Sequence, residues 1–194
     1  MTNAPIDPLV IIELTNLKAA GKLEELAKHP SLAMKPEWMG ELAANTNWLV
    51  RYWLASNPAL ISSANAVTSL VRDGDYRVRW SLAQNPAIAN YPEVIQTLAA
   101  DKNHTVRSWL AENPTIADCP EAIQTLASDE DWIVRRNLAQ NPAIASSPEA
   151  IQTLSGDSVR AVSEALALNP AIPSRTASTN PWQTIQPATQ VPAV

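Results

Sequence analysis

Apolar residues recur along the chain with a period of 28 residues. The clearest copies of the repeat begin at Val78, Val106 and Val134, and each keeps the same order of apolar and polar positions. Two columns hold leucine in every copy: Leu14, Leu42, Leu70, Leu98, Leu126 and Leu154, and Leu26, Leu54, Leu82, Leu110, Leu138 and Leu166. A fixed period of this length is typical of a stacked repeat array, in which each unit buries its apolar face against its neighbours.

The spacing inside one repeat predicts two helices. Ile123 and Leu126 are three residues apart, and Val134 and Leu138 are four apart, so each pair shares one helix face. The proline that follows Asn141 predicts the end of the second helix, because the residue before a proline is pushed out of the helical region. The residue two positions after each such proline is an isoleucine, whose side chain is expected to be buried and to anchor the loop to the core: Ile88, Ile116, Ile144 and Ile172.

The start of each helix carries a capping signal. Capping boxes are predicted for the first helices from pairs of residues three apart: Asn90 and Glu93, Asp118 and Glu121, Ser146 and Glu149. For the second helix, either Asp129 or Asp131 could accept from the free backbone N–H groups of the first turn. Together these signals predict an all-α protein, an α-solenoid of about six helical hairpins of 28 residues each.

The array is expected to cover residues 8–175, after an N-terminal extension of residues 1–7. Its units are 8–35, 36–63, 64–91, 92–119, 120–147 and 148–175. The end units depart from the pattern, as caps with one neighbour should: His29 replaces an asparagine and Ser163 an arginine. Residues 176–194 are rich in proline and nearly uncharged, so a flexible tail is expected. Trp182 and Ile185 leave open a docking peptide, a fold-back cap or a plain linker.

The repeated motif is V-R-x-x-L-A-x-N-P followed by L-A-x-D, which in one unit is Val78-Arg79, Leu82-Ala83, Asn85-Pro86, Leu98-Ala99 and Asp101. Over about residues 36–172 the chain resembles the leucine-rich repeat variant family. The resemblance implies a right-handed superhelix, loosely related to HEAT and armadillo arrays. The repeat here is longer than the family's, which predicts full α-helical hairpins in place of short 3₁₀ segments. No cysteine precedes the repeats, so the iron–sulfur cluster known in that family is not expected.

Composition narrows the function classes. The chain has 14 Lys and Arg against 19 Asp and Glu, a net charge of −5, which makes nucleic acid an unlikely partner. Cys119 is the single cysteine, so neither an intramolecular disulfide nor a cysteine-rich metal site is expected. No apolar run approaches the roughly 18 residues that cross a bilayer, and a cytoplasmic protein without membrane contact is expected.

Catalysis has little support in the sequence. The two histidines fall in unrelated columns, and the four glycines form no phosphate-binding loop. We therefore expect no catalytic residue, no metal, no cofactor and no enzymatic activity.

The charged positions of the repeat permit two interpretations. Arginine and aspartate recur at fixed offsets: Arg51, Arg79, Arg107 and Arg135, with Asp73, Asp101, Asp129 and Asp157. The arginines could form a basic stripe that follows a phosphate backbone. Alternatively, arginines and aspartates could tie neighbouring units together as a structural ladder. We favour the ladder, because a contact between successive units requires the same residue type at the same position of each repeat.

The variable columns of the second helix are the candidates for recognition. They hold aromatic, histidine and arginine side chains, from which we predict a partner-binding set: Trp48, Tyr52, Trp53, Tyr76, Trp80, His104, Trp109, Trp132 and Arg136. These side chains could form a ribbon that clamps a peptide, or they could fill gaps between hairpins in a chain without Phe. The favoured function is a non-catalytic protein-interaction scaffold. A nucleic-acid-binding HEAT-like module and a self-assembling rod are the alternatives, and the sequence leaves the partner and the oligomeric state open.

Overall fold

The computed structural model of the protein describes residues 8–172. Within that range it has twelve α-helices, five 3₁₀ helices and no strand, so the prediction of an all-α protein is confirmed. None of the helices formed by residues 8–172 is long and apolar enough to cross a membrane. The predicted N-terminal extension and tail, together with residues 173–175 of the sixth unit, lie outside the described residues.

Each unit contributes a first helix, a second helix and, in five units, a 3₁₀ helix that leads to the next unit. The first helices are α1 (Pro8–Ala19), α3 (Pro36–Ala43), α5 (Ala64–Leu70), α7 (Pro92–Ala99), α9 (Pro120–Ala127) and α11 (Pro148–Ser155). The second helices are α2 (Leu23–Lys28), α4 (Trp48–Ser56), α6 (Tyr76–Gln84), α8 (His104–Glu112), α10 (Trp132–Gln140) and α12 (Arg160–Ala167). The 3₁₀ helices are η1 (Pro30–Met34), η2 (Pro58–Ser62), η3 (Pro86–Asn90), η4 (Pro114–Asp118) and η5 (Pro142–Ser146).

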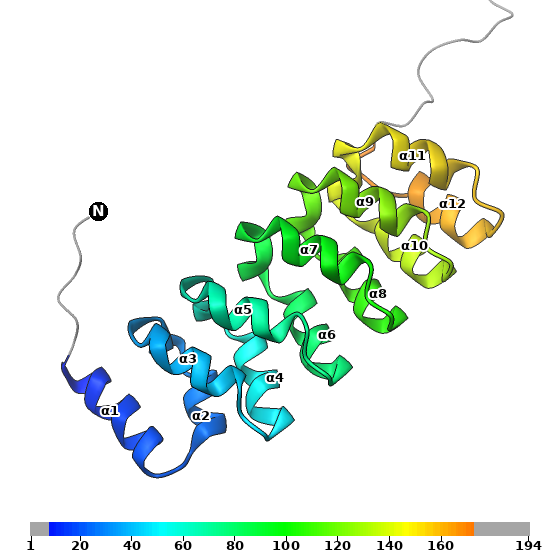
Figure 1. Ribbon diagram of the computed structural model, residues 1–194. Coiled ribbons are helices and arrows are strands. Elements are labelled where there is room, and N and C mark those ends of the chain that lie inside the picture. The colour runs from blue at the N-terminus through cyan, green and yellow to red at the C-terminus, as the bar shows by residue number, and fades with distance from the viewer. Residues whose placement is uncertain (1–7, 173–194) are drawn as a thin grey trace, which may run out of the picture.

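The helix pairs follow one another along the molecule from α1 and α2 to α11 and α12 (Figure 1). Every second helix packs against the second helix of the next unit, and successive 3₁₀ helices contact one another in the same way. The contacts between neighbouring second helices are more extensive than those between neighbouring first helices. The second helices are therefore the more closely packed row of the stack.

The apolar core lies between these rows. Both predicted leucine columns are buried along their whole length, which confirms the periodicity as the core pattern. Ile88, Ile116 and Ile144 are fully buried as predicted, while Ile172 at the end of the described chain is partly buried. Burial of each such leucine or isoleucine contributes about 1.5–3 kcal/mol, so the repeated pattern alone supplies most of the driving force.

The predicted capping boxes are wrong. Asn90, Asp118 and Ser146 are the last residues of η3, η4 and η5, and the first helices begin one residue later than a capping box requires. The residue before the helix, such as Tyr91 before α7, makes no side-chain cap. These residues form part of a 3₁₀ turn, and the N-cap position falls on the residue after them.

The prediction of α-helical hairpins in place of 3₁₀ segments is also wrong in one respect. In five units the connection that follows the Asn-Pro or His-Pro step forms a 3₁₀ helix of five residues, in addition to the two α-helices. The second helices, by contrast, begin as expected: Asp131 caps α10 by accepting from the Ile133 N–H at 2.8 Å. Asp129 lies two residues earlier and accepts from the backbone N–H of Asp131 at 2.8 Å.

Candidate functional site

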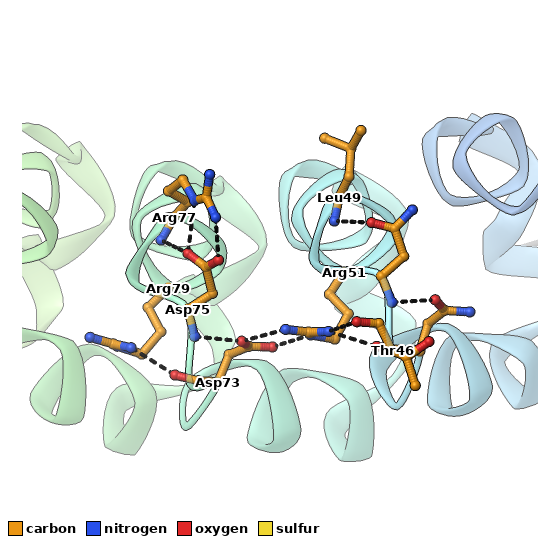
Figure 2. Close-up of polar contacts among 9 residues, drawn as sticks. Thr46, Leu49, Arg51, Asp73, Asp75, Arg77 and Arg79 are labelled. Atoms are coloured by element: carbon orange, nitrogen blue, oxygen red, sulfur yellow. Dashed lines mark hydrogen bonds and ion pairs between the residues drawn. The ribbon is translucent and has the colours of Figure 1, made fainter.

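The repeated arginines and aspartates pair across unit boundaries. Arg79 Nε donates to Asp101 Oδ2 at 2.6 Å, and Arg79 Nη2 donates to Asp101 Oδ1 at 2.9 Å, a bidentate contact between residues 22 apart. The same pair of bonds joins the other three: Arg51 with Asp73, Arg107 with Asp129, and Arg135 with Asp157. We call these eight residues the arginine–aspartate ladder, of which Figure 2 shows the part from Arg51 to Arg79.

Each ladder arginine is held at a third point. Arg79 Nη1 donates to the carbonyl oxygen of Asp73 at 2.7 Å, which ties the second helix to the loop before it. Asp101 in turn accepts from the backbone N–H of Asn103 at 2.8 Å and so shapes the loop before α8. The side chains of Arg79 and Asp101 are only 6% and 7% exposed. The hydrogen bond that Arg79 donates to Asp101 raises the pKa of the Arg79 guanidinium, which stays charged and directed into the protein.

A second ladder, which the sequence did not predict, runs through the asparagine before each proline. Asn85 Nδ2 donates to the carbonyl oxygens of Ala55 at 2.7 Å and Asn57 at 3.0 Å, both in the preceding unit. Its Oδ1 accepts from the backbone N–H of Ala87 at 2.9 Å and so caps η3. Equivalent bonds to the preceding unit are made by the other members of this asparagine ladder: Asn57, Asn113, Asn141 and Asn169.

The signal for the asparagine ladder was present in the sequence. A turn before proline does not require asparagine, yet asparagine stands at this position in five units and is buried in each. The first unit has His29 instead, whose Nδ1 accepts from the Ser31 N–H at 3.2 Å. His29 thus reproduces the capping half of the asparagine's role. The other role of the asparagine, donation from its side-chain amide, requires carbonyl oxygens of a preceding unit.

All nine predicted partner-binding residues lie on second helices, from α4 to α10. We call the surface that they form the second-helix face: Trp48, Tyr52, Trp53, Tyr76, Trp80, His104, Trp109, Trp132 and Arg136. The structure brings five of the rings into one continuous aromatic cluster: Trp48, Tyr52, Trp53, Trp80 and Trp109. The cluster spans three successive units, and each of its rings is half-buried.

The cluster is held together by edge and tilted ring contacts. The Tyr52 ring lies 5.1 Å from Trp53 and 6.2 Å from Trp80 between ring centroids. Trp80 in turn lies 5.9 Å from Trp109, with the two ring planes 33° apart. Such separations are those of favourable aromatic pairs, which contribute about 0.5–1.5 kcal/mol each. The cluster is therefore a fixed surface, with little entropy to lose when a partner covers it.

Two cations cover part of the cluster from neighbouring units. The Arg77 guanidinium lies 3.5 Å above the Trp48 ring, and the Lys28 ammonium lies 3.9 Å above the Trp53 ring. Arg77 is itself oriented by Asp75 Oδ2, which accepts from Arg77 Nη2 at 2.6 Å (Figure 2). The hydrogen bond from Arg77 also lowers the pKa of the Asp75 carboxyl. Trp48 and Trp53 thus fill gaps between units on one side while they remain part of the surface on the other.

Trp80 is the cluster member with an unsatisfied polar group. Its Nε1 is buried and donates to no acceptor among the described residues. A buried donor without a partner costs about 1–3 kcal/mol. The adjacent residue, Arg79, has all three of its nitrogen atoms bonded, so the contrast lies within one turn of α6. The position of Trp80 therefore carries the free-energy cost of one unsatisfied N–H donor.

The remaining members of the face are more polar in their contacts. Tyr76 and Trp132 are 43% and 42% exposed and take no part, within residues 8–172, in the ring contacts of the cluster. His104 Nδ1 lies 3.0 Å from Asp131 Oδ2. Near Arg136, Asn137 Nδ2 donates to Glu112 Oε1 at 2.6 Å, and desolvation raises the pKa of the Glu112 carboxyl while Arg136 opposes that rise. The ring contacts of the face thus end at α8, and α10 carries the exposed Trp132 together with polar contacts.

Groups with potential reactivity are few in the described part of the chain. Residues 8–172 contain no cluster of three or more His, Cys, Asp and Glu side chains that could hold a metal ion. Cys119 is buried, and burial raises the pKa of its thiol, with smaller contributions from Asp118 and Glu121. Such a thiol stays protonated and is a poor nucleophile.

Comparison with known proteins adds no family assignment. No model of a protein family matches the chain, and no curated protein matches it either. The resemblance to the leucine-rich repeat variant family stays a prediction from the motif. What the molecule presents is a stack of helical repeats, tied by two polar ladders and carrying one aromatic face.

Proposed function

We propose that the chain is a right-handed α-solenoid that serves as a non-catalytic interaction scaffold. It binds an extended peptide, or an exposed segment of a partner protein, through the second-helix face. The observation that carries this proposal is the aromatic cluster, five half-buried rings in contact across three successive units. The free thiol of Cys119 suits a reducing compartment, and we place the protein in the cytoplasm.

The closer packing of the second helices supports this choice of surface. We infer that the second helices line the concave side, because in a curved stack the row with the closer spacing lies on the inside and neighbouring second helices are the more closely packed row. Concave surfaces of helical repeat arrays are extended binding surfaces. At about 10 Å between neighbouring helices, the distance from α4 to α8 is about 20 Å. A peptide of about six extended residues spans that distance.

The chemistry of the cluster favours a protein ligand. Tryptophan and tyrosine are the side chains that most often anchor protein interfaces, because they bury a large rigid surface at a small entropy cost. A nucleic acid would need free cationic side chains, and the four ladder arginines are bonded to aspartates and backbone carbonyls of the array itself. The acidic balance of the whole chain points the same way.

The self-assembling rod has less support, because the ends lack ladder residues. Within the array, the asparagine of each unit donates to carbonyl oxygens of the unit before it. If a second copy stacked on the last unit, its first unit would carry His29 at this position, which has no side-chain amide to donate. The last unit has Ser163 in the arginine column, and the first unit of a second copy has Leu17 in the aspartate column. End-to-end stacking of two copies would therefore form neither ladder.

The scaffold proposal can be tested with a displayed library of random peptides of about 12 residues, enough to cover the six-residue span with margins. Peptides are selected on the full chain and then measured against the double variant Trp80→Ser/Trp109→Ser. Serine is a residue that the array already accommodates there, because Ser108 stands in the column of Trp80 and Ser81 in that of Trp109. The matched control is Trp38→Ala on α3, whose column holds Ala66 and Ala122.

Selected peptides should bind the parent chain and Trp38→Ala equally and lose at least about tenfold in affinity on the double variant, about 1.4 kcal/mol. Equal binding to the double variant would contradict the proposal. Fluorescent DNA and RNA oligonucleotides provide the second arm. Tight binding that weakens steeply between 50 and 200 mM salt would support the nucleic-acid alternative instead.

A further inference from the structure

We propose that the second-helix face is covered by the chain's own residues 173–194, which follow Ile172 and run back over α12, α10 and α8 onto the aromatic cluster. The inference rests on the proposed function, since it makes this segment a competitor of the external partner. It also identifies the chemistry that the face recognises: a proline-rich, nearly uncharged extended peptide.

The composition of the segment fits the surface. Residues 173–194 contain four prolines, at 173, 181, 187 and 192, and Arg175 is their single charged side chain. Proline-rich peptides in the polyproline II conformation bind surfaces lined with aromatic rings, because their rigid backbone loses little entropy on docking. Trp80, whose ring contacts both Tyr52 and Trp109, lies at the centre of the cluster.

Exposed apolar side chains mark a path from the start of the segment to the cluster. Leu168 is 82% exposed and stands four residues before Ile172, in a column where the other units carry lysine, serine, glutamine or glutamate. On the next second helix, α10, Trp132 and Ile133 are also exposed. Large exposed apolar residues at the end of α12 and at the start of α10, between Ile172 and the cluster, indicate a surface that something apolar covers.

The length of the segment is sufficient. A polyproline II chain rises about 3.1 Å per residue, so 22 residues reach about 68 Å, and Trp182 can lie about 31 Å from Ile172. At about 10 Å per unit, α8 lies about 20 Å from α12, α6 about 30 Å and α4 about 40 Å. Trp182 and Pro181 therefore reach α6 and α8, and Pro187 reaches α4.

Covalent attachment makes even a weak contact sufficient. A segment joined to its site by a short linker has an effective concentration in the millimolar range. A face occupied in this way binds an external peptide less tightly than an open face. The external partner must displace the segment, and a substitution that weakens docking should raise the affinity for the external peptide.

The test uses the full chain with a nitroxide spin label on Thr184→Cys, which the reach above places between α6 and α4. Cys119→Ser removes the second attachment site, and the array accommodates serine in this column at Ser63 and Ser147. The indole N–H signals of the tryptophans are recorded by NMR with ¹⁵N-labelled protein, with the label oxidised and reduced. Single variants Trp80→Ser, Trp109→Ser and Trp38→Ala assign the signals.

Docking predicts that the signals of Trp80 and Trp109 lose most of their intensity in the oxidised sample, while Trp38 on α3 keeps its own. Trp182 lies beside the label and must lose its signal in every case, which checks the labelling. With Pro181→Gly/Trp182→Ala added, the signals of Trp80 and Trp109 should recover, and the affinity for a library-selected peptide should rise.

Two results would overturn the inference. Full intensity for Trp80 and Trp109, or equal loss at Trp38, would mean that the segment does not occupy the face. In a mixture of ¹⁵N-labelled chain without the nitroxide and unlabelled chain that carries it, broadening would assign the segment to a second copy. The peptide-library experiment separates failure of this inference from failure of the proposed function. If library-selected peptides bind the second-helix face while residues 173–194 do not dock there, the scaffold proposal stands and only the docking of the segment is excluded.

Discussion

Arg79 and Trp80 are neighbours on α6, yet they behave oppositely. Arg79 is buried, and its three nitrogen atoms donate to Asp101 and to the Asp73 carbonyl. Trp80 is half-buried, and its indole N–H has no acceptor among the described residues. The arginine is repeated in four units, and the tryptophan stands in a column that also holds tyrosine, serine and arginine. The same residue type recurs from unit to unit where it bonds to the next unit, and it varies from unit to unit where it faces outward.

The asparagine ladder should give the largest effect on stability. Asn141→Asp keeps the shape of the side chain but removes the N–H donors from the carbonyls of Ala111 and Asn113, and it places a carboxylate beside both. We expect the free energy of unfolding to fall by about 4 kcal/mol, because two buried acceptors lose their partner. Urea denaturation followed by circular dichroism measures the change.

The control for that substitution is His29→Asn, which should change the free energy of unfolding by less than about 0.5 kcal/mol, because no preceding unit offers carbonyls to a new amide. If Asn141→Asp lowered the free energy of unfolding as little as the control does, the asparagine ladder would not be a main source of stability.

The arginine–aspartate ladder comes next. Arg107→Ala leaves the buried carboxylate of Asp129 without its bidentate partner and should cost about 3 kcal/mol. Arg160→Ala is the matched control, since Arg160 pairs with Glu164 on the surface and its side chain is 89% exposed. That exposed pair should contribute less than about 0.5 kcal/mol. Similar losses in the two variants would show that burial of the ladder is not what makes it stabilising.

Acid should weaken the same ladder. The hydrogen bond from Arg135 lowers the pKa of Asp157 below its ordinary value of 3.8. Because the carboxyl binds protons more weakly in the folded chain, its contribution is complete above about pH 4 and is lost as the pH falls through the lowered value. Thermal unfolding between pH 2 and 7 should show this loss, and Arg135→Met should reduce its slope. An unchanged slope would mean that Asp157 does not contribute to the acid sensitivity.

The smallest effect is expected at His104. Its contact with Asp131 lies on the surface, and its column holds Trp48, Tyr76 and Trp132 in other units. His104→Tyr should therefore change the free energy of unfolding by less than about 0.5 kcal/mol. Its effect should fall instead on which library peptides the chain selects. A loss of several kcal/mol would place His104 among the structural residues.

The repeat itself made much of this predictable. The leucine columns followed from periodicity, and the pairing of Arg79 with Asp101 followed from arginines and aspartates that recur at fixed offsets in four successive units. The capping boxes failed because Asn90 could be assigned to a helix start only by ignoring a 3₁₀ turn of five residues. The 3₁₀ turn depends on packing against the neighbouring 3₁₀ helices, which a local motif does not encode.

The asparagine ladder was missed for a related reason. The Asn85 side chain bonds to carbonyls 28 and 30 residues earlier, and only the stacking of units brings those atoms together. The role of the aromatic rings was also left open by the sequence. Whether a tryptophan fills a gap or forms a surface depends on how closely the second helices approach, and here Trp48 and Trp53 do both.

The most direct test of the distinction between repeated and variable positions is the free energy of unfolding of Trp80→Ser/Trp109→Ser. If the rings form a surface, the double variant should lose no more than about 2 kcal/mol, within the range of ordinary substitutions. Two core tryptophans would instead cost about 3–5 kcal/mol each. A total loss above about 6 kcal/mol would therefore contradict the account and return both rings to the core.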